Sequence, residues 1–125
     1  MKEIILTDKA PAPIGPYSQA IKAGNLLFLS GQIGINPATG QMQVSMEDQT
    51  RQIMKNIHAL VEKCGCGLES ILKTTIFLVN LQDFAKVNDV YKEYFTGDFP
   101  ARTTVEVSSL PKSALIEIEA IALIQ

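Results

Sequence analysis

Residues 115–124 alternate strictly between two kinds of side chain, and this alternation constrains the fold more than any other feature of the sequence. Because successive side chains of a β-strand point to opposite faces, the segment is typical of a strand with two unlike faces. One face is entirely apolar and must lie under helices: Ile116, Ile118, Ala120, Ala122 and Ile124. The other mixes carboxylates with large aliphatic groups: Leu115, Glu117, Glu119, Ile121 and Leu123. The pattern predicts a sheet covered by helices on one side.

A second strand, predicted over residues 102–107, divides in the same way. Thr103, Val105 and Val107 share one side, and Arg102, Thr104 and Glu106 share the other. When the more apolar faces of the two strands are matched, the second set lies on the same sheet surface as Glu117 and Glu119. We therefore expect Arg102 and Glu117 on one face, pointing away from the helices.

The aliphatic side chains on that face require cover, and a chain of 125 residues has no further element to provide it. We expect a homo-oligomer that packs sheet face against sheet face, with the charged residues at or near the interface. Partly buried Arg and Glu side chains need partners, which are each other or a ligand. The alternative is a solvated pair of charges that contributes little.

The remaining segments complete one small domain that spans residues 1–125. Three prolines in residues 9–18 predict a stiff extended loop, and Gly24-Asn25 between two apolar runs predicts a hairpin of residues 19–23 and 26–30. Ser45 with Asp48 predicts the start of a helix whose apolar stripe runs to Cys64. Further along, we expect a buried strand (70–79) and a second helix (80–95). This order predicts an α+β fold, a two-layer domain with one mixed β-sheet and two helices on one face.

Composition narrows the classes of function. The net charge is −2, the pI is about 5.3 and the Lys and Arg residues are scattered, so a nucleic-acid partner is not expected. No stretch approaches the roughly 18 apolar residues of a membrane span, so we expect no membrane partner and a cytoplasmic location. His58 and the two cysteines form no metal-ligand set and no nucleophile pair. The available chemistry is that of Arg, Glu, Tyr, Thr, backbone amides and water.

Two further polar residues have two interpretations each. Asn88 lies in the apolar stripe of the second predicted helix, four residues after Phe84, where a polar amide needs hydrogen-bond partners. It contacts either a ligand or a nearby loop backbone. Tyr17, at the end of the proline-rich loop, is either a site residue or a packed ring with a satisfied hydroxyl.

Several segments in order resemble the RidA family, also called YjgF. The main ones are Pro100-Ala101-Arg102-Thr103-Thr104-Val105-Glu106-Val107 and Ile116-Glu117-Ile118-Glu119-Ala120-Ile121-Ala122. Leu110-Pro111-Lys112, Ser30-Gly31-Gln32-Ile33 and the segment around Tyr17 add to them, so the likeness covers essentially the whole chain.

The resemblance implies a chorismate-mutase-like fold assembled as a trimer, with three sites in clefts between subunits. It implies hydrolysis of 2-aminoacrylate-type enamines and imines, the products of pyridoxal-phosphate enzymes, to 2-oxo acids and ammonia, without a cofactor or metal. The substrate is then a small carboxylate. The implied roles are Arg102 as carboxylate anchor, Glu117 as the water-orienting acid and Tyr17 as a further catalytic residue. Residues that line or support the pocket are Ser30, Gly31, Asn88 and Thr104.

Two positions differ from many relatives. Thr104 stands where cysteine is frequent, so a thiol role does not transfer, although the Thr104 backbone N–H can still meet a carboxylate. Gly34 stands where proline is common. Two other functions stay open: a metabolite-binding module that uses the same clefts, and a ribonuclease or translation inhibitor, which the acidic balance opposes.

Overall fold

The computed structural model describes all residues, 1–125. Its strands are β1 (Lys2–Ile5), β2 (Ala20–Ala23), β3 (Leu26–Gln32), β4 (Ile35–Asn36), β5 (Gln41–Met42), β6 (Ile71–Leu78), β7 (Ala101–Glu106) and β8 (Ile116–Leu123). The helices are α1 (Met46–Lys63) and α2 (Phe84–Tyr91), and four short 3₁₀ turns cover Leu68–Ser70, Leu81–Asp83, Lys92–Tyr94 and Pro111–Ser113.

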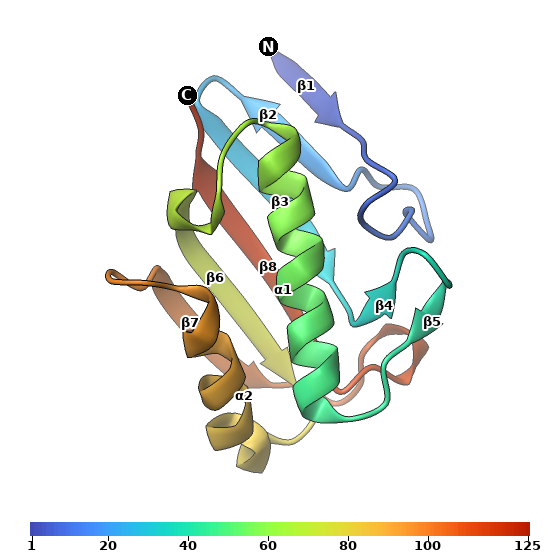
Figure 1. Ribbon diagram of the computed structural model, residues 1–125. Coiled ribbons are helices and arrows are strands. Elements are labelled where there is room, and N and C mark those ends of the chain that lie inside the picture. Colours follow the sequence, from blue (N-terminus) through green and yellow to red (C-terminus); the bar gives the residue numbers. More distant parts are fainter.

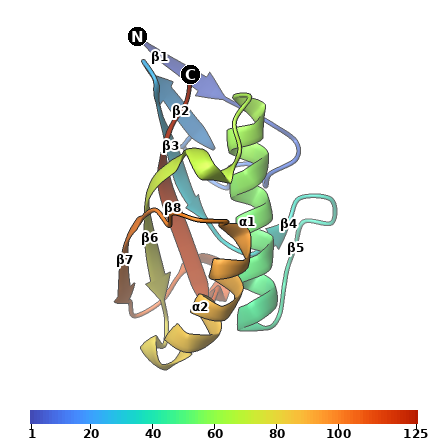
Figure 2. The same ribbon diagram turned by 60° about the vertical axis from the view of Figure 1, so that its left-hand side comes forward.

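Six strands form one sheet in the order β1-β2-β3-β8-β6-β7, and β4 pairs with β5 in a small separate ribbon. β6 and β7 are parallel and the other pairs of the main sheet are antiparallel, so the sheet is mixed. Figure 1 shows α1 lying across the sheet with α2 beside it, and the turned view in Figure 2 places both helices on the same face. The predicted two-layer α+β fold is confirmed. Strand β1, which the sequence analysis did not predict, adds a sixth strand at one edge.

The core lies between this helix-covered face and α1. All five predicted inward residues of the segment 115–124, which contains β8, are buried, as are Ile53, Ile57 and Leu60 of α1. The helix begins as predicted, because the Ser45 hydroxyl oxygen accepts a 3.0 Å hydrogen bond from the Asp48 N–H. No helix of the chain combines the length and the apolar character that a membrane crossing requires.

The second helical region is less regular than predicted. Residues 81–94 form a 3₁₀ turn, the eight-residue α2 and another 3₁₀ turn in succession. Asn80 caps the start, since its side-chain oxygen accepts a 3.0 Å hydrogen bond from the Gln82 N–H. The short α2 lies beside β6 and β7 (Figure 1), and its residues Phe84 and Tyr91 contact Arg102 of the edge strand.

The expected placement of Arg102 and Thr104 is wrong. In the parallel pairing, Arg102 lies opposite Thr74 and Thr104 opposite Ile76, and both partners in β6 are fully buried under the helices. Paired residues of neighbouring strands share a face, so Arg102 and Thr104 point to the helix side. Matching the more apolar faces fails at this strand because the short α2 packs its aromatic rings against polar side chains of β7.

Glu117 pairs with Phe77 and Glu119 with Thr75, on the opposite face of the sheet. We call this opposite side the open face, since no helix covers it (Figure 2). Its exposed large apolar side chains are Ile4, Phe28, Val105 and Leu123. The expectation that this face carries apolar groups in need of cover therefore agrees with the structure, while Arg102 does not belong to it.

Candidate active site

Most of the predicted site residues line two separate hollows, whereas Ser30 and Thr104 line neither. The first, which we call the Arg102 half-site, lies on the helix side where α2 meets the start of β7. Its lining residues are Phe84, Asn88, Tyr91, Lys92, Phe99, Pro100 and Arg102. The second, the Glu117 half-site, lies where the proline-rich loop meets β3 and β8 and is described below.

Arg102 is held by aromatic rings and by no carboxylate. Its guanidinium carbon lies 5.2 Å from the ring centre of Phe84 and 5.2 Å from that of Tyr91, within the range of cation–π attraction. The chain contains three ion pairs, and Arg102 takes part in none of them. The planar guanidinium therefore keeps its N–H donors available for an external carboxylate, which it can bind through two parallel hydrogen bonds.

Two of the other predicted residues accompany Arg102. Asn88 lines the same hollow, four residues after Phe84 on α2. Thr104 follows Arg102 on the same face of β7, and its hydroxyl oxygen is buried without any hydrogen-bond partner. Buried polar atoms are nearly always satisfied, so this hydroxyl is an exception among the side chains of the chain.

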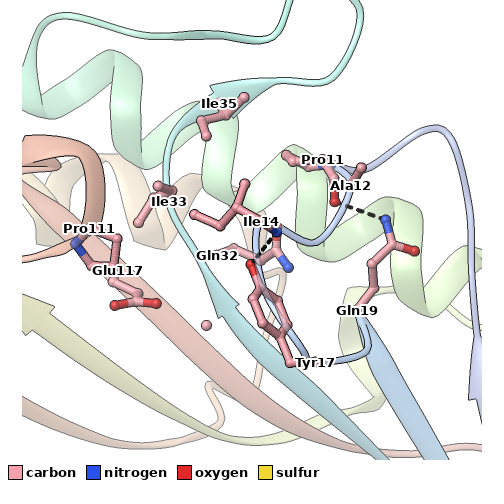
Figure 3. A pocket seen from close by; sticks show the side chains of 11 residues that line it. Pro11, Ala12, Ile14, Tyr17, Gln19, Gln32, Ile33, Ile35, Pro111 and Glu117 are labelled. Carbon is pink, nitrogen blue, oxygen red and sulfur yellow. Dashed lines mark hydrogen bonds between the residues drawn. The ribbon is translucent and has the colours of Figure 1, made fainter.

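The Glu117 half-site combines the proline-rich loop with β3 and β8. Its lining residues are Pro11, Ala12, Ile14, Tyr17, Gln19, Gly31, Gln32, Ile33, Ile35, Pro111 and Glu117. In Figure 3, Glu117 lies on the side of β8 and Tyr17 on the side of the loop. The hollow is thus bounded by segments far apart in the sequence.

Glu117 is the ionisable group of this half-site. Desolvation by the surrounding protein raises the pKa of its carboxyl group, and the negative charge of Glu119, two residues along the same face, raises this pKa further. The carboxylate has no hydrogen-bonded partner among the side-chain hydrogen bonds of the chain. A carboxyl group with a raised pKa at the edge of a hollow is suited to exchange protons with a bound molecule.

Gly31 makes room for that carboxylate. The pairing of β3 with β8 shifts between Leu29 and Gln32, so Ser30 and Gly31 form a bulge. A Cβ atom at position 31 would collide with the Glu117 carboxylate. Glycine at position 31 therefore leaves the Glu117 carboxylate free to lie against the bulge, and a larger residue would displace that carboxylate.

Ser30 has a structural use in this chain. Its hydroxyl donates a 2.6 Å hydrogen bond to the Ser18 carbonyl, and its N–H donates a 3.0 Å bond to the Gln19 carbonyl. Both bonds tie the bulge of β3 to the end of the proline-rich loop. Ser30 thus supports the Glu117 half-site from behind and does not line it.

Tyr17 is 46% exposed, and its hydroxyl oxygen accepts a 3.2 Å hydrogen bond from the Ile14 N–H (Figure 3). The hydroxyl proton stays free to be donated. The alternative interpretation of Tyr17, a packed ring with a satisfied hydroxyl, therefore holds only in part. The oxygen accepts a hydrogen bond, but the hydroxyl donates none within the chain.

Gln19, which was not predicted as a site residue, holds the loop that carries Tyr17. The Gln19 side chain is 1% exposed, accepts a 2.8 Å bond from the Thr7 N–H and donates bonds of 2.9–3.2 Å to the carbonyls of Thr7, Ala10 and Pro11. A glutamine at the start of a predicted strand has no sequence feature that indicates these hydrogen bonds to the loop.

Two buried amides of α1, Gln49 and Asn56, were missed as well. Asn56 donates a 3.0 Å bond to the Ile35 carbonyl, and Gln49 accepts a 2.9 Å bond from the Leu115 N–H. Here a signal existed, because polar residues interrupt the inward side of a helix whose neighbours Ile53 and Ile57 are buried. They fix the backbone beside the Glu117 half-site.

The two half-sites belong to opposite faces of one sheet, because Arg102 pairs with the helix-facing Thr74 while Glu117 pairs with Phe77 of the open face. Within one chain the sheet itself separates them.

Comparison with known proteins gives a consistent family. The family described as Endoribonuclease L-PSP matches residues 7–124. The chain is similar to a RutC family protein of Pyrococcus horikoshii, with 58% identity over 98% of this chain and 98% of that protein. It is also similar to the 2-iminobutanoate/2-iminopropanoate deaminase of Dermatophagoides farinae, with 48% identity over 99% of this chain and 98% of that one.

Among solved structures, the fold is similar to that of Escherichia coli TdcF with bound serine. The TM-score is 0.95, with 41% identity over 98% of this chain and 99% of that one.

Proposed function

The chain belongs to the RidA (YjgF) family, and from this premise we propose that it hydrolyses reactive 2-aminoacrylate-type enamines and imines to 2-oxo acids and ammonia. The observation that carries the proposal is the presence of an unpaired, aromatic-held guanidinium and a carboxyl group of raised pKa in two half-sites of one chain. The deaminases named among the relatives support it.

In the proposed reaction, Arg102 binds the substrate carboxylate through two parallel N–H···O hydrogen bonds. The backbone N–H of Thr104 can add a further donor, and Asn88 lines the same hollow. Because the imine carbon is already electrophilic, the enzyme does not have to generate a covalent intermediate. What it has to supply is a fixed substrate and a well-placed water molecule.

Glu117 takes a proton from the water that attacks the protonated imine, so that the C–O bond forms, the C=N bond becomes a single bond and the nitrogen becomes a neutral amino group. Return of that proton to the amino group lets the C–N bond break and ammonia leave, and the Glu117 carboxylate takes the hydroxyl proton as the C=O bond of the 2-oxo acid forms. A well-placed general base of this kind contributes about 10²–10⁴-fold. The free hydroxyl proton of Tyr17 is available to the polar atoms of the reacting centre, and the bulge at Gly31 gives Glu117 its room.

A complete site then needs two chains, one that contributes Arg102 and one that contributes Glu117. Two unlike surfaces that meet in this way form a heterologous contact, and repetition of the contact closes a ring. The resemblance to RidA implies a ring of three. The exposed apolar side chains of the open face provide surface for such an assembly.

The sharpest test of the shared site mixes two inactive variants, Arg102→Ala and Glu117→Gln, by co-expression or by refolding together. Each chain lacks one half, so a site built within one chain stays inactive in every mixture. A site shared between chains recovers about a quarter of wild-type activity in an equal, random mixture, since one in four contacts joins two intact halves. Absence of any recovery in verified mixed oligomers contradicts the shared site.

The reaction itself is tested by coupling the protein to a threonine dehydratase, which generates the enamine in place. Semicarbazide traps the imine that escapes hydrolysis. We expect the trapped product to fall as the protein is added, and not to fall with Glu117→Gln.

A metabolite-binding function is the second candidate, favoured by the serine bound in the similar TdcF structure. If the chain has this function, a 2-oxo acid binds at Arg102, but addition of the protein does not change the amount of product trapped by semicarbazide.

A further inference from the structure

We infer that Tyr91 and Thr74 are positioning residues that hold the Arg102 guanidinium in the orientation that receives a carboxylate. The inference rests on the proposed function of the Arg102 half-site as a carboxylate anchor. It assigns a task to a buried polar pair that the reaction described above does not use.

The Tyr91 hydroxyl and the Thr74 hydroxyl form a 2.8 Å hydrogen bond in which either oxygen can be the donor. Tyr91 is 3% exposed and Thr74 is fully buried. Thr74 is also the residue of β6 that lies directly opposite Arg102 of β7. The bond therefore links α2 to the sheet at the position from which the Arg102 side chain extends.

The two rings that contact Arg102 differ in freedom. Phe84, the first residue of α2, is 40% exposed, whereas Tyr91, the last residue, is buried at both ring and hydroxyl. A second ring, Phe95, packs 5.0 Å from Tyr91. Tyr91 is thus the more firmly held of the two rings that contact Arg102, and Phe84 is the ring nearer to solvent.

Aromatic rings have a specific advantage over a carboxylate for this purpose. A carboxylate beside Arg102 would occupy the N–H donors and compete with the ligand, whereas a ring attracts the cation through its face. The guanidinium is then oriented before binding while its donors stay open. Preorganisation of this kind lowers the cost of binding, so its loss raises Kd and KM more than it lowers kcat.

The first experiment compares 2-oxobutanoate binding by calorimetry with steady-state kinetics in single variants. Removing the ring in Tyr91→Leu should raise Kd and KM about 10-fold or more. Removing only the hydrogen bond, in Tyr91→Phe or Thr74→Val, should raise Kd and KM about 2- to 5-fold. The variant Thr74→Ser keeps the hydroxyl and should have Kd and KM values near those of wild type. The matched control is Tyr94→Leu, a tyrosine of the neighbouring turn outside the Arg102 half-site.

The second experiment separates positioning from a general loss of structure. Millimolar guanidinium should restore 2-oxobutanoate binding to Arg102→Ala, because the slot between the rings remains. Rescue should persist in Arg102→Ala/Tyr94→Leu and disappear in Arg102→Ala/Tyr91→Leu, each checked for oligomer mass and melting temperature.

Equal rescue in the two double variants, or an equal Kd for Tyr91→Phe, Tyr91→Leu and Tyr94→Leu, overturns the inference. If guanidinium rescues none of the variants, the Kd series decides alone. Wild-type protein that binds 2-oxobutanoate without hydrolysing imines contradicts the proposed function and leaves the inference standing. Wild-type protein that binds no 2-oxo acid overturns both.

Discussion

The Arg102 half-site and the Glu117 half-site are incomplete in opposite ways. The first holds a cation between aromatic rings with no counter-charge, and the second holds a half-buried carboxyl group whose pKa is raised by desolvation and by the charge of Glu119. An arginine–glutamate pair within one chain would have neutralised both. Their separation on two faces of the sheet keeps each group in the state in which it can act on a third molecule.

The halves also differ in how they are built. Regular elements, α2 and β7, make the Arg102 half-site, while a proline-rich loop and a strand bulge make much of the Glu117 half-site. Loop and bulge are held by buried side-chain hydrogen bonds of Gln19 and Ser30. The comparison indicates that the anchor depends on helix packing and the acid depends on local backbone geometry.

The largest expected effect is that of Arg102→Ala. Without the guanidinium no group of the half-site can bind a carboxylate through paired N–H donors, so kcat/KM for imine hydrolysis should fall by about 10³-fold or more. The control is Arg51→Ala, which removes an exposed ion pair with Glu93 and should leave activity near wild type. Unchanged activity in Arg102→Ala, with the oligomer intact, would refute the assignment of this arginine.

A smaller loss is expected for Gly31→Ala, which tests the acid half alone. The new Cβ displaces the Glu117 carboxylate, so kcat should fall by about 10²-fold while 2-oxo acid binding at Arg102 changes little. Gly15→Ala is a suitable control, because a Cβ there makes only ordinary contact with the Tyr17 ring at 3.6 Å. Equal kinetics for the two variants would show that the close approach at position 31 has no catalytic consequence.

A shift in pH dependence is expected for Glu119→Gln. The charge of Glu119 is the lesser of the two causes that raise the pKa of Glu117, so its removal should lower that pKa only in part. Because the base acts when deprotonated, the acidic limb of kcat/KM against pH should move to lower pH. Glu62→Gln, on the exposed surface of α1, provides the control and should leave the limb in place.

The smallest effect concerns stability. A carboxyl group whose pKa is higher in the folded than in the unfolded state contributes stability that is fully present below the unfolded pKa and is lost as pH rises through the folded pKa. Glu117→Gln mimics the protonated form at every pH. Its melting temperature should equal that of wild type in acid and exceed it at neutral pH, measured by thermal scans across that range. A lower melting temperature at neutral pH would show that Glu117 stabilises the fold.

Much of the architecture could be predicted because it depends on local pattern. The inward face of β8, the Ser45 cap and the Gly24-Asn25 turn follow from alternation, side-chain hydrogen bonding and backbone freedom within a few residues. β1 could not be predicted, since its four residues are too few to show a pattern and it is held only by pairing with β2. The candidate site residues were proposed from chemistry and family resemblance, whereas the face on which Arg102 and Thr104 lie was predicted wrongly.

The sequence by itself determined which residues alternate within each strand and therefore which side chains share a face with one another. Only the tertiary structure decided which of the two faces of β7 turns toward the helices. Alternation does not specify which face of a strand turns toward the helices, because the same pattern fits both orientations of β7. The choice between them depends on parallel pairing with β6 and on the aromatic rings that α2 places over Arg102. That choice puts Arg102 and Glu117 on opposite faces of the sheet.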